Sequence, residues 1–197
     1  MALVEDEGKI WQRFNSQRTL MGIQDWQVCV PTDKLEEASR LLQGPQNMKY
    51  YTISEEVPGL HPESLMHTFP RFKCNGILLW FKLVPALDCH IQCVPQNIER
   101  SKAGIPYPTL PVYAQSLLDT ASGTDLEDLI DGMDLTGEWG ESNLDLEGTS
   151  NVAWATAKNE RIRASVVIDE NTCLFELWEG AFPRRAFWEE RLGQKEH

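Results

Sequence analysis

The sequence lacks any long apolar run. No stretch approaches the roughly 20 consecutive apolar residues that a membrane-spanning helix requires. Near Met1, four charged residues interrupt any run of signal-peptide length: Glu5, Asp6, Glu7 and Lys9. We therefore predict a cytoplasmic protein with no membrane as its partner.

Cysteines in a regular pattern are also missing. The chain has five, an odd number, and their spacing is irregular. This composition is typical of reduced thiols in a cytosolic protein and argues against a disulfide framework. With 197 residues and 42% hydrophobic content, the chain can bury its own core without such cross-links.

Basic residues are absent between Lys102 and Lys158, although ten acidic residues fall there. The formal net charge of the chain is −12, and most of it comes from this acidic segment, residues 119–147. A basic surface supplies most of the affinity for bulk nucleic acid, so we expect no nucleic-acid partner. Arg184, Arg185 and Arg191 form a basic cluster that can pair with the acidic segment.

The first half of the sequence predicts an α/β (α+β) core. A buried strand over residues 23–30 is followed by a helix with Asp33 as its N-cap. Further strands are expected over residues 48–53, 76–84 and 87–94, with a loop over 55–67. This order predicts a small mixed sheet with flanking helices.

The second half predicts a mostly helical region. Residues 101–108 read as a turn-rich linker, and helices are expected over 110–119, from Thr124 with a capping box, and over 151–163. We accordingly divide the chain into an α/β core, residues 1–100, and a helical acidic region, residues 101–197, packed on it as one compact unit. The oligomeric state is left open.

Polar side chains recur on two of the predicted strands. Alternation places Asp25 and Gln27 on one face of the first strand, which is nearly a metal site but one carboxylate short. On the later strand, alternation groups Asp88, His90 and Gln92. Two interpretations stay open: a solvated strand face, or a pocket in which these residues meet Asp25 and Gln27.

Cys89, His90 and Cys93 could suggest zinc. On a strand, however, Cys89 and Cys93 would lie about 13 Å apart, with His90 facing the other way. We therefore expect no bound metal.

Three stretches of the sequence resemble one family. The first is Met21–Pro31 with the helix start Lys34–Ala38. The second comprises residues 115–120 and 125–133, and the third is residues 139–146. They resemble a group of uncharacterised fungal proteins that look like reduced members of the nucleotidyltransferase (DNA polymerase β-like) superfamily. The resemblance implies a nucleotidyltransferase-like sheet in residues 1–100.

Active members of that superfamily use a Gly-Ser turn, an Asp-x-Asp strand and a third acid to hold two metal ions. The resemblance places Asp25 at the first acid and Asp88 at the third, but Gln27 stands where the second should be. No glycine precedes Gly22 in residues 14–22, so the Gly-Ser turn is missing too. Both charge neutralisation and positioning are weakened, which implies a degenerate site.

Three functions follow as expectations. The leading one is a protein that binds a small molecule or a protein partner in the former active-site cleft, without cofactor. The alternative is a metal-independent enzyme, such as an isomerase or cyclase, acting on an apolar substrate by acid–base chemistry. The third is a weak Mg²⁺-dependent nucleotidyltransferase. We assign catalytic roles to Asp25, Asp88 and His90, and ligand binding to Gln27, Gln92 and Trp80.

Overall fold

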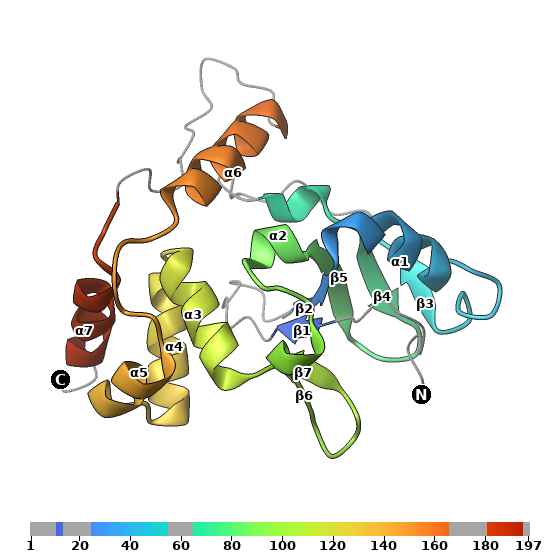
Figure 1. Ribbon diagram of the computed structural model, residues 1–197. Coiled ribbons are helices and arrows are strands. Elements are labelled where there is room, and N and C mark those ends of the chain that lie inside the picture. The colour runs from blue at the N-terminus through green and yellow to red at the C-terminus, as the bar shows by residue number, and fades with distance from the viewer. Residues whose placement is uncertain (1–10, 14–24, 55–64, 166–180, 195–197) are drawn as a thin grey trace. The chain divides into compact units, whose positions relative to one another are not determined.

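The computed structural model describes residues 11–13, 25–54, 65–165 and 181–194, and these form two compact units (Figure 1). Unit 1 comprises residues 1–60 and 66–109, and unit 2 comprises residues 61–65 and 110–197. The boundary falls between Thr109 and Leu110, compared with the predicted position between residues 100 and 101. Among the described residues, no helix is both long and apolar enough to cross a membrane.

Unit 1 is built on a five-stranded mixed sheet, which confirms the predicted α+β class. Its central strands, β2 and β5, run parallel, and the other neighbouring pairs are antiparallel. In spatial order the strands are β1 (Trp11–Arg13), β2 (Asp25–Val30), β5 (Trp80–Pro85), β4 (Arg71–Cys74) and β3 (Tyr51–Ile53).

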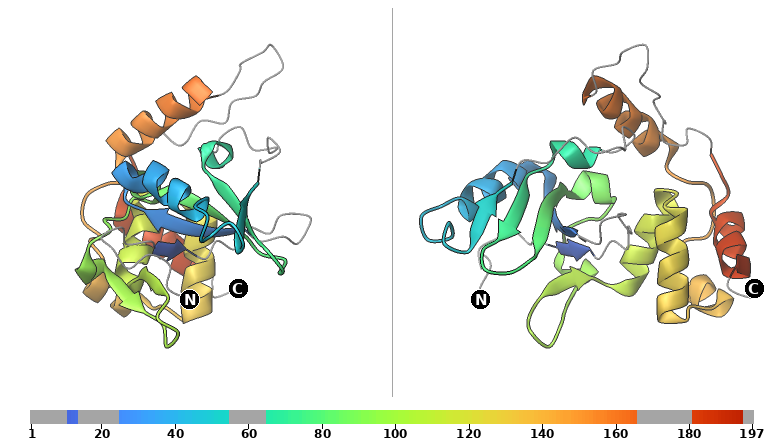
Figure 2. Two further views of the ribbon diagram at one scale, coloured as in Figure 1. Left: turned by 90° about the vertical axis from the view of Figure 1, so that its right-hand side faces the viewer. Right: turned by 180° about the vertical axis from the view of Figure 1, so that it is seen from behind.

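One face of this sheet is apolar and carries the core of unit 1. Helix α1 (Leu35–Leu42) lies against it, with Leu42 buried and Leu35 and Ala38 packed on the cluster (Figures 1 and 2). The buried members of the cluster are Val30, Leu42, Tyr51, Phe72, Phe81 and Leu83. Because side chains alternate along a strand, the neighbours of these residues point to the opposite face.

The predicted strand over residues 76–84 is wrong in its first half. Residues 75–79 instead turn the chain from β4 into β5, with Gly76 at φ +87° and Leu78 88% exposed. Asn75-Gly76 is a strong hairpin signal because a tight turn of this kind needs positive φ. β4 itself was not predicted, whereas β3 lies within the predicted strand over 48–53.

The predicted strand over residues 87–94 is also wrong. After β5 the chain forms the one-turn helix α2 (Ala86–Cys89), which His90 ends in the left-handed conformation at φ 51°. Pro85 is extended and starts this helix, because its fixed φ suits a helix start and its missing N–H cannot serve a ladder. A 3-10 turn, η3 (Pro95–Asn97), then leads into a hairpin of β6 (Ile98–Arg100) and β7 (Pro106–Pro108). Only β7 and the turn before it fall within the expected linker, residues 101–108.

Unit 2 is helical, as predicted. Its described helices are α3 (Leu110–Asp119), α4 (Gly123–Met133), α5 (Gly137–Asn143), α6 (Val152–Ser165) and α7 (Arg184–Gln194). Their core holds Leu117, Leu118, Leu126, Ile130, Leu135, Leu146 and Trp188. Trp188 packs directly on Gly140, where an added Cβ would lie 2.4 Å from the indole Nε1.

Two predicted helix starts need correction. α1 follows a 3-10 turn, η1 (Thr32–Lys34), so Lys34 rather than Asp33 is its N-cap. α4 begins at Gly123 after Ser122, one residue before the predicted capping box. Neither N-cap side chain bonds the helix, so tertiary packing fixes these starts more than local capping does.

Candidate ligand-binding site

The acids predicted to share a site lie at opposite ends of the parallel strands. Asp25 begins β2 and pairs with Trp80, whereas Val30 at the other end pairs with Pro85. Asp88 follows Pro85, within α2. The Asp25–Trp80 pair and the Val30–Pro85 pair are five residues apart, which is about 16 Å along a strand. The structure therefore does not bring Asp25 and Asp88 together.

The remaining predicted residues also divide between the two ends. Asp88 is buried in α2, His90 is half-buried at its C-cap, and Gln92 is exposed in the following coil. Since this segment is not a strand, the predicted polar face of Asp88, His90 and Gln92 does not exist. Gln27 and Trp80, by contrast, lie on adjacent strands of the sheet.

Gln27 belongs to a row of polar residues on the face of the sheet opposite α1. Its Cα pairs with that of Lys82 on β5, which in turn pairs with Arg71 on β4. Gln27 is 5% exposed and Lys82 is 7% exposed, so an amide and a cation are both buried side by side. Burying a charge is costly, and such a position is a common mark of a functional site.

Trp80 adds an aromatic side chain to this face and sits between cationic neighbours. The Arg71 guanidinium carbon lies 5.7 Å from its ring centroid, and the Lys73 Nζ lies 5.5 Å from it. Arg71 also donates to the Ser54 hydroxyl at 3.4 Å. We call Gln27, Trp80, Lys82, Arg71 and Lys73 the polar face. It runs from the buried Gln27 to the exposed Lys73.

The amide oxygen of Gln27 is buried without a contact that stabilises the fold. This atom, Oε1, has no hydrogen-bond partner. Leaving a buried acceptor unpaired costs about 1–3 kcal/mol, so such an atom calls for an explanation. An incoming donor from a ligand would satisfy it.

Two other buried polar atoms without partners, both in unit 2, have simpler explanations. Trp188 Nε1 is pressed against Gly140, which leaves no room for a ligand. Arg191 Nε belongs to a guanidinium whose other nitrogens pair with Glu127 and Glu190. Gln27 differs because neither explanation applies to its buried Oε1.

Lys82, Arg71 and Lys73 were missed from the sequence. Residues 71–74 alternate as Arg-Phe-Lys-Cys and are followed by Asn75-Gly76, a pattern that predicts a half-buried hairpin strand. The sequence also marks Lys82 as a candidate site residue, because it is a single charge inside the apolar stretch from Leu78 to Val84. Within a predicted strand, such a charge has to be paired or functional.

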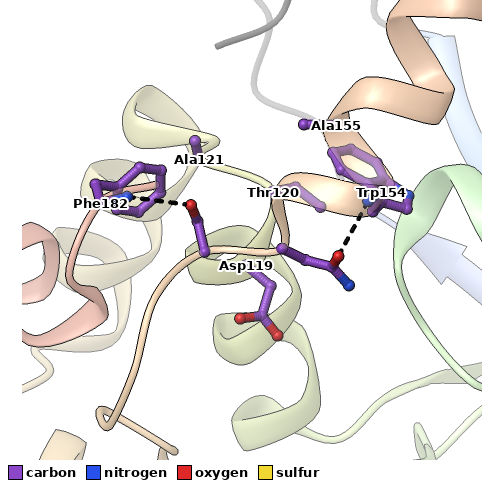
Figure 3. Close-up of a pocket in the computed structure, with 8 residues that line it drawn as sticks. Asp119, Thr120, Ala121, Trp154, Ala155 and Phe182 are labelled. Carbon is purple, nitrogen blue, oxygen red and sulfur yellow. Dashed lines mark hydrogen bonds between the residues drawn. The ribbon is translucent and has the colours of Figure 1, made fainter. Parts of the chain in front are cut away.

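Unit 2 contains a small pocket of about 80 Å³ beside the end of α3 (Figure 3). Trp154 on α6 and Phe182 lie on different sides of it, and Asp119 contributes a carboxylate. Ser150 accepts a hydrogen bond from the Phe182 N–H, and Asn151 accepts one from the Trp154 N–H. This volume suits ~2–3 water molecules, too little for a metabolite.

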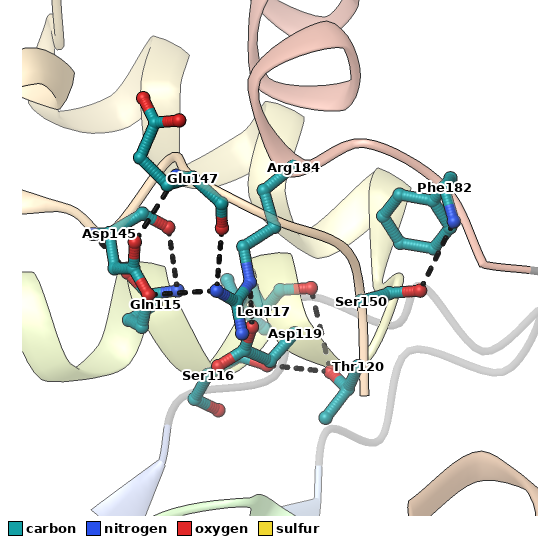
Figure 4. Close-up of polar contacts among 10 residues, drawn as sticks. All are labelled: Gln115, Ser116, Leu117, Asp119, Thr120, Asp145, Glu147, Ser150, Phe182 and Arg184. Atoms are coloured by element: carbon teal, nitrogen blue, oxygen red, sulfur yellow. Dashed lines mark hydrogen bonds and ion pairs between the residues drawn. The ribbon is translucent and has the colours of Figure 1, made fainter. Parts of the chain in front are cut away.

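The acid of that pocket is part of a structural clamp (Figure 4). Arg184 donates to Asp119 at 2.7 Å, to Asp145 at 2.8 Å and to the Glu147 carbonyl at 2.9 Å. Gln115 bonds the backbone of Asp145 from α3 in both directions. These contacts fasten the chain after α5 to α3 and α7, so we assign Asp119 to the fold of unit 2.

The neighbouring arginine makes exposed pairs. Arg185 donates to Glu141 and to Glu147. The hydrogen bond between Arg185 and Glu141 lowers the pKa of Glu141 and raises that of Arg185. Arg191 donates to Glu127. The three arginines therefore pair with the acidic segment, as predicted.

Within the part of the chain that the structure describes, no three His, Cys, Asp or Glu side chains are placed to hold a metal ion. Comparison of the chain with protein-family models, with curated proteins and with solved structures finds no match.

Proposed function

We propose that unit 1 is a binding domain whose polar face takes up an anionic small molecule with a planar group, of which a nucleotide is the leading example. The observation that carries this proposal is the buried, unpartnered Gln27 amide beside the buried cation of Lys82. The ligand would bring a negative charge and a hydrogen-bond donor together. No other described residue of unit 1 has a buried polar side-chain atom without a partner.

Charge supports an anion over a metal ion on this face. Lys82 stands next to Gln27, and Arg71 stands next to Lys82, so a divalent cation there would meet positive neighbours. A phosphate or carboxylate would meet attractive ones, and a charge-assisted hydrogen bond in such a setting is about twice as strong as a neutral one. Trp80 offers a large apolar surface for the planar group.

This proposal keeps the leading expectation from the sequence and narrows it. A degenerate nucleotidyltransferase-like domain that has exchanged an acid for Gln27 would retain nucleotide binding without two-metal transfer chemistry. The acid–base alternative cannot use Asp25 and Asp88 together, because they lie at opposite ends of the strands. Binding rather than catalysis is the function we assign to the polar face.

Isothermal titration calorimetry of the full chain tests the proposal. ATP, AMP, adenosine and inorganic phosphate are titrated separately, each with and without Mg²⁺. We expect saturable binding of the nucleotides, weaker binding of phosphate or adenosine alone, and no requirement for Mg²⁺. Lys82→Met should weaken nucleotide binding about tenfold or more, since it removes a buried charge-assisted contact.

Lys49→Met is the matched control. Lys49 is an exposed lysine of the same unit whose Nζ lies 4.7 Å from the Tyr50 ring centroid, outside the polar face. The two variants change net charge equally, so a general electrostatic effect would weaken both. Equal loss in both variants, or no saturable binding of any nucleotide by the wild-type chain, would refute the proposal.

A further inference from the structure

Two cysteines of unit 1, Cys89 and Cys93, lie near Cys29 beyond the end of the polar face. Cys29 lies on β2, two residues after Gln27, and its Sγ is 3.8 Å from that of Cys93. The side chain of Cys89, in α2, also interacts with the Cys29 thiol and raises its pKa. Cys29 is thus the central member of a cluster whose other members are 60 or more positions away in the sequence.

The helical turn explains why the sequence did not reveal this cluster. On a strand, Cys89 and Cys93 would be far apart and could not both reach Cys29. In the structure α2 ends at Cys89, and the left-handed His90 reverses the chain. Both cysteines consequently return to the same residue of β2.

The three thiols differ in access. Cys29 and Cys89 are 0% exposed, whereas Cys93 is partly exposed. The neighbouring thiols and burial raise the pKa of Cys29 well above its ordinary value. An oxidant from solution therefore reaches Cys93 first, whereas Cys29 stays protonated and buried next to it.

We propose that Cys93 is a peroxide-oxidised cysteine that Cys29 resolves as an intramolecular disulfide. In the first step the Cys93 thiolate attacks a hydroperoxide, the O–O bond breaks, and Cys93 becomes a sulfenic acid while hydroxide or alkoxide leaves. In the second step the Cys29 sulfur attacks the Cys93 sulfur, the S–O bond breaks, and water leaves with the Cys29 proton. With hydrogen peroxide, two thiols are oxidised and two waters form.

The geometry needs only a small movement. The two sulfurs are 3.8 Å apart and must approach to about 2.05 Å. Cys93 lies in the coil between α2 and η3 and pairs with no strand, so it can make this movement more easily than β2. The bond would fasten that coil to β2. This inference does not depend on nucleotide binding.

The test exposes the reduced full chain to hydrogen peroxide and maps its disulfides by mass spectrometry. We expect the free-thiol count to fall by two and one disulfide to join Cys29 with Cys93. No Lys or Arg separates Cys89 from Cys93, so trypsin leaves both in one peptide. Fragmentation of the linked peptide, or the same experiment on Cys89→Ser, assigns the partner.

Thermal unfolding supplies a second readout. Because the cross-link closes a loop between residues 64 positions apart, the oxidised chain should unfold at least about 5 °C higher than the reduced chain. Cys93→Ser should lose both the disulfide and this rise. Cys74→Ser is the control and should keep both, since Cys74 packs on the opposite, apolar face.

Three outcomes would overturn the proposal. One is an unchanged thiol count after peroxide treatment. Another is a disulfide that does not contain both Cys29 and Cys93. The last is oxidation of Cys93 to sulfinic acid while Cys29 remains a thiol.

Discussion

The two units of this chain use charge in opposite ways. Unit 1 has eleven basic and eleven acidic residues, whereas unit 2 has seven basic and nineteen acidic residues, which accounts for the whole net charge of −12. In unit 2, Arg184, Arg185 and Arg191 are all paired with acids of the same unit. In unit 1, Lys82, Arg71 and Lys73 gather on one sheet face around an amide that the fold leaves unpaired.

We infer that the paired arginines of unit 2 hold its fold, and we propose that the Gln27 amide of unit 1 serves a ligand. A paired side chain in unit 2 should cost stability when it is removed. The unpaired amide in unit 1 already costs stability and should be dispensable for folding. The following variants break or sharpen that contrast, from the largest expected effect to the smallest.

Trp188→Ala removes the aromatic centre of the unit 2 core and should lower the free energy of unfolding by about 3–5 kcal/mol. Trp188 is 1% exposed and packs on Gly140. Urea unfolding followed by circular dichroism measures the loss. Leu78→Ala, at an 88% exposed hairpin tip of unit 1, is the control and should change stability by less than about 0.5 kcal/mol. A loss below about 1 kcal/mol for Trp188→Ala would contradict the assigned core.

Arg184→Met should destabilise unit 2 by about 2–4 kcal/mol, because it leaves the buried Asp119 carboxylate without its cation. Arg185→Met is the matched substitution one residue later and breaks only exposed pairs, so it should cost about 0–1 kcal/mol. Urea unfolding of both variants gives the comparison. Equal losses would show that the clamp at Arg184 is no more than a surface ion pair.

Gln27→Met replaces the unpaired amide with an apolar side chain of similar shape. We expect the variant to be as stable as the wild type or more stable by about 1 kcal/mol, since a buried polar group without a partner is removed. Urea unfolding of the ligand-free chain is the measurement. A loss of more than about 1 kcal/mol would make Gln27 a structural residue and remove the contrast between the units.

The exposed Glu141–Arg185 pair should give the smallest effect, visible only in its pH dependence. The hydrogen bond from Arg185 lowers the pKa of Glu141 below its ordinary value of 4.5. A lowered carboxyl pKa contributes stability above that ordinary value, and the contribution is lost as the pH falls through the folded-state pKa. The difference in urea midpoint between wild type and Arg185→Met should therefore shrink below pH 4.5; a difference that is constant with pH would count against the pair.

The sequence predicted the kind of secondary structure in each unit better than the path of the chain within it. The helix over 110–119 and the strand over 23–30 followed from the pattern of apolar residues, which local spacing reveals directly. The predicted strand over 87–94 failed because Pro85 and His90 turn the chain there. Its apolar and polar residues alternate like those of a strand, although no neighbouring strand pairs with it.

The candidate site shows the same limit. Gln27 and Trp80 were predicted, but their neighbours Lys82 and Arg71 become visible only once strand register is known. Asp25 and Asp88 were each predicted to lie on a strand, yet the parallel arrangement of β2 and β5 separates them. Register depends on pairing between distant segments, and one sequence contains little information about it.

Hydrogen–deuterium exchange with and without ATP tests most directly whether unit 1 is the binding unit. We predict slower exchange of backbone amides in β2, β4 and β5 when ATP is bound, and unchanged exchange in α3 and α6, which flank the Asp119 pocket. Protection around Asp119 instead, or no protection in either unit at saturating ATP, would contradict the account.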